Sequence, residues 1–135
     1  MLSLDALNQA VAAHWAAAGP DLPTRHADQR LASDRLAAWT ELWVLPLESQ
    51  PTRAAADHVT VEVLVHLFVQ PRESRVRIEQ LADAARAALA RQTLPVADGW
   101  LRLGEVELRD LSRDDDADGL APRHLVLIAR GDATQ

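Results

Sequence analysis

The densest group of potential metal ligands is the segment RDDDADG, from Arg113 to Gly119, in which four of seven residues are aspartates. Asp114, Asp116 and Asp118, followed by glycine, fit the opening D-x-D-x-D-G of a calcium-binding loop. An EF-hand loop also needs a bidentate acid at its twelfth position and a helix on each side. The twelfth position here is Leu125, and both flanking segments resemble strands. We therefore interpret Asp114 to Asp118 as an acidic turn between two strands, and we predict no metal there.

The five histidines, at positions 14, 26, 58, 66 and 124, also show no metal-binding spacing. None belongs to an H-E-x-x-H motif or to a pair four residues apart on a helix. His58 and His66 share one face of a predicted strand, but eight residues of strand place them about 26 Å apart. They cannot hold the same ion. The sequence therefore predicts no metal site among the histidines.

Catalytic motifs are equally absent from the sequence. There is no G-x-S-x-G elbow, and the serines fall in predicted caps or loops, where the hydroxyl satisfies backbone groups. The five scattered glycines form no phosphate-binding loop. We predict no catalytic and no cofactor-binding residue, and hence a protein that is not an enzyme.

Protein–protein contact is the remaining kind of site that the residue types suggest. Trp39 and Trp43 lie four residues apart in a predicted strand and share a face with Glu41. Tryptophan is highly buried on average, so the favoured interpretation places both in the core. The alternative is a subunit contact, because tryptophan is enriched among interface anchors. The candidate interface residues are Trp39, Trp43, Arg53, Glu62 and His66.

Composition limits the classes of protein to which the chain could belong. Its 135 residues are the usual size of one domain, and it has no cysteine for a disulfide or a thiolate site. The 14 basic residues are all arginine and face 20 acidic ones, a net charge of -6 that argues against binding to nucleic acid. No apolar run approaches the roughly 20 residues that span a membrane. We expect a single domain over residues 1–135, located in the cytoplasm, with neither nucleic-acid nor membrane partners.

Hydrophobic periodicity predicts the elements that must position these residues. Apolar residues at three- and four-residue steps predict a helix from Leu4 to Ala18, and a second helix is predicted from Glu73 to Gln92. Strands are predicted from Ala38 to Glu48, His58 to Gln70, Trp100 to Leu111 with a bulge near Gly104, and Ala121 to Arg130. Residues 20–35 are interpreted as a connector, and the segment between the first two strands as a projecting loop.

The strand from His58 to Gln70 gives the strongest pattern. A branched aliphatic residue stands at every second position: Val59, Val61, Val63, Val65, Leu67 and Val69. The opposite face is half polar, so one side should be covered by helices and the other should meet water or a partner. The predicted fold is α+β, a four-stranded, mainly antiparallel sheet with two helices packed on one face, in the order α-β-β-α-β-β.

This layout resembles that of the tail terminator and minor tail proteins of long-tailed phages and prophages, over nearly the whole chain and without a signature motif. The resemblance implies a homo-oligomeric ring, often hexameric, that caps the tail tube and joins it to the head connector. It also implies other tail proteins as partners, and the bacterial cytoplasm or the virion as the location. The loop from Pro51 to Asp57 and the acidic turn would then face the tube or its lumen, where negative charge repels the DNA phosphates. The alternative is a small ferredoxin-like module that binds a ligand or peptide and forms a dimer.

Overall fold

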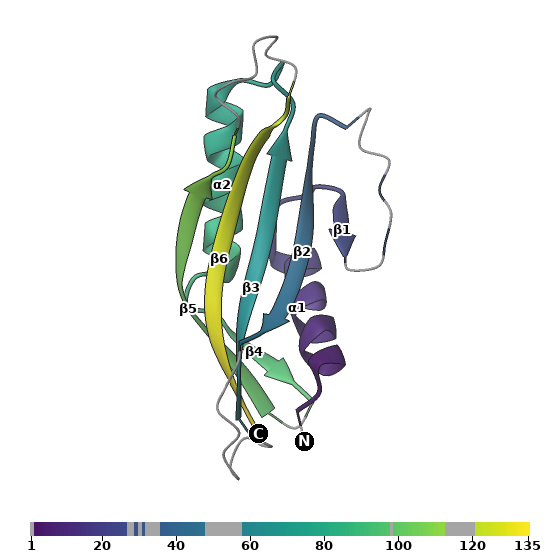
Figure 1. Cartoon of the computed structure of the whole chain (residues 1–135), viewed down its shortest axis with the longest axis vertical. Helices are drawn as coiled ribbons and strands as arrows, with labels where there is room; N and C mark the ends of the chain where they lie inside the picture. The colour runs from purple at the N-terminus through teal and green to yellow at the C-terminus, as the bar shows by residue number, and fades with distance from the viewer. Residues whose placement is uncertain are drawn as a thin grey trace.

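The computed structural model describes residues 2–26, 29, 31, 36–47, 58–97, 99–112 and 121–135. Along the chain the elements are α1 (Leu4–Ala18), β1 (Thr24–His26), β2 (Ala38–Pro46), β3 (His58–Val69), α2 (Arg75–Leu89), β4 (Thr93–Val96), β5 (Gly99–Asp110) and β6 (Arg123–Thr134). Figure 1 shows the two helices on the same side of one twisted sheet. Neither described helix has the length and apolar character needed to cross a bilayer.

The sheet has six strands in the order β1-β2-β3-β6-β5-β4, so the prediction of four strands is wrong, although the α+β class holds. It is mixed rather than antiparallel at one edge, because β1 pairs with β2 in parallel. Both additional strands lie at edges and have only three and four residues. Strands this short carry no readable two-residue period, and Pro23 and Pro95 beside or within them favour a loop interpretation.

Both predicted helices are confirmed, although the second is shorter than predicted, and each has a serine as its N-cap residue. The Ser3 side chain accepts a hydrogen bond from the Ala6 backbone N–H, and Ser74 does the same for Arg77, both at 3.1 Å. Such caps satisfy backbone donors that the first helical turn leaves unpaired. Helix α1 then buries Leu7, Val11 and Trp15 against the sheet, while α2 buries a mainly alanine face. Small side chains on α2 allow it to approach the strands closely.

The aliphatic ladder of β3 forms the centre of the core, as predicted. Val61, Val63, Val65, Leu67 and Val69 are completely buried. Antiparallel pairing places Val63 opposite Val44 of β2 and Ala129 of β6, so the same face of three strands is apolar. These residues and the buried residues of both helices belong to one hydrophobic cluster. Burial of apolar area at roughly 25 cal/mol per Å² makes this cluster the main stabilising contact.

The bulge predicted near Gly104 is confirmed by a register shift between Leu103 and Val106 in the β5–β6 pair. Strand β6, however, starts and ends later than predicted and continues to Thr134. In the second half of β6 the core-facing positions are small residues, namely Ala129, Gly131 and Ala133. Small residues are weak strand formers, so the sequence pattern understates the length of the strand.

The side of the sheet that faces away from both helices is called the outer face below. It comprises the even-numbered residues of β3 and β6, the odd-numbered residues of β2, Arg25 of β1, and Trp100, Arg102, Glu107 and Arg109 of β5. These positions alternate with the ladder and pair with one another across the strands. Neither helix covers them, so the outer face is the part of the described structure where a functional surface is to be sought (Figure 1).

Candidate interaction surface

The outer face carries most of the aromatic side chains of the protein. The chain has four tryptophans and one phenylalanine, of which only Trp15 belongs to the core cluster. The others, Trp39, Trp43, Phe68 and Trp100, all point to the outer face. The favoured interpretation, that both tryptophans are core residues, holds for Trp39 in so far as that side chain is buried, at 7% exposed, although it lies outside the cluster beneath the helices; it does not hold for Trp43, which is only partly buried. Local spacing fixes that the two share a face but not which face the helices cover.

Three of the rings form one row across the sheet. Trp39, Phe68 and His124 lie directly opposite one another on β2, β3 and β6. The centroids of Trp39 and Phe68 are 5.2 Å apart and those of Phe68 and His124 are 4.3 Å apart, with both pairs stacked. Neighbouring strands are about 4.8 Å apart, a spacing that lets rings on adjacent strands stack. Each such pair contributes about 0.5–1.5 kcal/mol beyond its buried area, so the row stiffens this end of the face.

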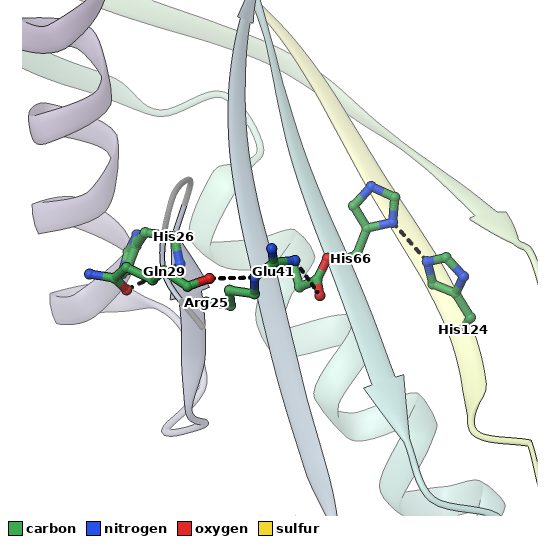
Figure 2. A network of polar contacts seen from close by, with 6 residues as sticks. All are labelled: Arg25, His26, Gln29, Glu41, His66 and His124. Carbon is green, nitrogen blue, oxygen red and sulfur yellow. Dashed lines mark hydrogen bonds and ion pairs between the residues drawn. The ribbon is translucent and has the colours of Figure 1, made fainter. Parts of the chain in front are cut away.

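His66 extends the row through a direct contact between two imidazoles. Its Nδ1 lies 2.7 Å from Nε2 of His124, a hydrogen-bond distance (Figure 2). One of these nitrogens must carry a proton and donate, while the other must be free of a proton and accept. The contact therefore excludes the state in which both rings are cationic.

The surroundings of this pair favour neutral rings. Burial lowers the pKa of His66, and the nearby Glu41 carboxylate opposes this shift. The pKa of His124 is lowered by burial and then by repulsion from His66, against opposing effects of Glu41 and Asp110. Glu41 is itself held by Arg25, at 3.2 Å, which limits its effect on the rings (Figure 2).

Charges on the outer face balance one another. Its arginines are Arg25, Arg102, Arg109 and Arg130, and its carboxylates are Glu41, Glu62, Glu107 and Asp132. Three ion pairs join them: Arg25 to Glu41 at 3.2 Å, Arg109 to Glu107 at 2.9 Å and Arg130 to Glu62 at 3.6 Å. The whole chain has a net charge of -6, so its entire acidic excess lies elsewhere.

The structure brings together four of the five candidate interface residues. Trp39, Trp43, Glu62 and His66 share the outer face, whereas Arg53 lies outside the described residues. The acidic segment Asp114 to Asp118 also lies outside them, so its interpretation as a turn stays a prediction. In the part of the chain that is described, no three His, Asp or Glu side chains gather as a metal site.

Sequence reasoning missed His124. Its importance comes from its contact with His66, which lies 58 residues away in the sequence. The only signal for this contact is the alternation in β3 and β6, and it becomes useful only when the pairing register is known. An open hollow of ≈ 340 Å³ adjoins this end of the row, lined by Phe68, Leu111, Ala121, Pro122 and His124.

Comparisons with known proteins place the fold but not the function. No protein-family model matches the chain, and no curated protein matches it. A solved structure of a protein that carries no functional name is similar to it, with a TM-score of 0.75 and 14% sequence identity. The similarity covers 100% of this chain and 98% of that one. At this identity the likeness establishes a shared fold over the whole chain and nothing beyond the fold.

Proposed function

We propose that the protein is a non-catalytic structural subunit that assembles with further copies of itself through the outer face. The observation that carries this proposal is the concentration of aromatic side chains on the one side of the sheet that neither helix covers: Trp43 and Phe68 are partly exposed there and Trp100 is 54% exposed, while Trp39 is buried opposite Phe68. Large aromatic side chains bury much area with little loss of side-chain entropy, and they are the usual anchors of interfaces.

Electrostatics favours a second copy as the occupant of this face. Two copies of a chain with a net charge of -6 repel each other, and the repulsion is weakest where the contacting surface is neutral. The outer face meets this condition because its four arginines balance its four carboxylates. A strongly basic partner would instead be attracted to the acidic remainder of the chain.

The form of assembly proposed here is the ring of a phage tail terminator, which would act in the bacterial cytoplasm and then in the virion, with other tail proteins as partners. This part rests on the α-β-β-α-β-β layout, which persists once the short edge strands β1 and β4 are set aside. A ring needs the outer face to contact a different surface of the next copy, whereas contact between two outer faces gives a two-fold dimer. The element order also differs from the β-α-β-β-α-β order of a ferredoxin-like module.

The experiment is a measurement of mass in solution, by light scattering after size exclusion and by native mass spectrometry, over a range of concentrations. Leu45 and Leu4 provide a matched pair, because they are 42% and 43% exposed and only Leu45 is on the outer face. We expect a defined oligomer that Leu45→Arg disrupts and Leu4→Arg leaves intact.

Each outcome separates the parts of the proposal. A closed ring of more than two copies supports the terminator-like assembly. A dimer that only Leu45→Arg disrupts supports contact through the outer face and overturns the ring. A monomer at every concentration, or equal loss of association in both variants, overturns the proposal as a whole.

A further inference from the structure

We propose that the His66–His124 pair makes assembly through the outer face sensitive to acid, so that copies associate while the pair is neutral and separate as it takes up protons. This inference rests on the proposed function, because it concerns the regulation of association through the same surface. The two imidazoles are in direct contact, with 2.7 Å between His66 Nδ1 and His124 Nε2.

The hydrogen bond between the rings can persist when the pair takes up one extra proton, but not when it takes up two. When both rings are neutral, one nitrogen donates and the other accepts, and a first extra proton can still leave an acceptor. A second extra proton places N–H groups on both facing nitrogens and two positive charges in contact. The two rings must then separate. The His124 ring, whose centroid is 4.3 Å from that of Phe68, must either leave this stacked position or stay in it with a positive charge.

Charged groups on the neighbouring strands do not reverse this preference. Glu41 on β2 favours protonation but is paired with Arg25 of β1. On β5, Asp110 favours protonation of His124, whereas Arg109 is a cation opposite Val126 and is paired with Glu107. Burial is the largest influence on both histidines and lowers the pKa of each.

Docking of a second copy strengthens the preference for neutral rings. Both histidines are half-buried in one copy, and His66 is directly opposite the buried Val126. A partner that covers the outer face removes the water that still reaches the imidazoles, and a charged ring loses more from this than a neutral ring does. Protons therefore bind more tightly to free copies than to assembled ones, and acid shifts the equilibrium toward free copies.

The experiment measures the dissociation constant of the assembly by analytical ultracentrifugation between about pH 5 and pH 8, the range in which histidine titrates. A chelator is present throughout the pH series, and a further run at neutral pH omits it, so that association through a metal ion bound by the two rings is told apart from control by protons. We expect the dissociation constant to rise about ten-fold for each unit by which the pH falls and for each proton taken up on separation. The double variant His66→Gln/His124→Gln should show a flatter profile, and the control His26→Gln, whose side chain faces the helix side, should match the parent.

The outcomes distinguish this inference from the proposal beneath it. Association that is independent of pH, or equally pH-dependent in the parent and the double variant, overturns the inference and leaves assembly through the outer face standing. Association that requires a metal ion, and is lost on chelation at neutral pH, also overturns it, because the ion then replaces the proton as the control. A monomer at every pH, and at neutral pH without the chelator, overturns both proposals together.

Discussion

His66 and His124 lie on neighbouring strands, β3 and β6, with 2.7 Å between Nδ1 of the first and Nε2 of the second. They are diagonal neighbours, because His66 is directly opposite Val126 and His124 is directly opposite Phe68. Diagonal neighbours on a sheet are within reach of each other only when the side chains are long or aromatic. The pair therefore depends on the β3–β6 register. A slip of that register by one residue would place the two rings on opposite faces of the sheet.

The pair should make folding itself sensitive to pH, independently of assembly. The folded-state pKa of each histidine is lowered, so the unfolded chain takes up protons first as the pH falls below the ordinary histidine value of 6.5. The free energy of unfolding should therefore fall from about pH 7 until the lowered pKa values are passed, and these two groups add no further change below that point. Urea unfolding of the Leu45→Arg variant, chosen to keep the chain monomeric, measures this. A flat profile between pH 7 and pH 5, or one unchanged by His66→Gln/His124→Gln, would contradict the prediction.

Val63→Asp should prevent folding. Val63 is completely buried between Val44 and Ala129, and an unpaired carboxylate there costs several kcal/mol, a large part of the stability of a typical domain. The control is Val76→Asp, because Val76 is 61% exposed in the first turn of α2, where an acidic residue is favourable. Circular dichroism and thermal melts should show an unfolded chain in the first variant and a melting temperature close to the parent in the second. A folded Val63→Asp variant would mean that the helices cover the other face.

Phe68→Leu should weaken the aromatic row without opening a large cavity. Phe68 stacks on both Trp39 and His124, so the substitution removes two ring contacts and should lower the free energy of unfolding by about 1–3 kcal/mol. Tryptophan fluorescence should also change, because Trp39 loses its stacking partner. Leu64→Met is the control, because Leu64 lies on the same face of β3 as Phe68, four positions earlier. It should change the free energy of unfolding by less than about 1.5 kcal/mol. Equal effects of the two substitutions would show that the row adds nothing beyond apolar contact.

Gly131→Ala should destabilise the β5–β6 pair. A Cβ atom at Gly131 would lie 2.8 Å from Cδ2 of Leu103 and 2.9 Å from Cδ1 of Leu101, inside the packed core. Overpacking of this kind costs about 1–3 kcal/mol. Gly104→Ala is the matched control, because the nearest atom to its Cβ is the Arg130 carbonyl oxygen at an ordinary 3.7 Å. Thermal melts should rank the parent and Gly104→Ala together above Gly131→Ala, and the reverse order would contradict the assignment of Gly131 to the core face.

Local patterns carried the prediction of the long elements. The three- and four-residue steps from Leu4 to Ala18 and the strict alternation from Val59 to Val69 each depend on one segment of chain, so the sequence is enough to read them. Edge strands β1 and β4 were missed because three or four residues cannot display a period. Their strand conformation comes from hydrogen bonds to a neighbour, as when the Thr40 N–H donates to Pro23 O at 2.9 Å.

The sequence by itself determined which side chains share a face: Trp39 with Trp43, and Glu62 with His66. The alternation in β3 also predicted that the helices cover the valine face, and its burial confirms this. Only the tertiary structure decided that Trp39 and Trp43 lie on the outer face and that His124 meets His66. The physical reason is that alternation is a property of one extended segment. The order of the strands, their pairing register and the face that β2 turns to the helices depend instead on contacts between segments far apart in the chain, and those contacts are decided by the packing of the whole core.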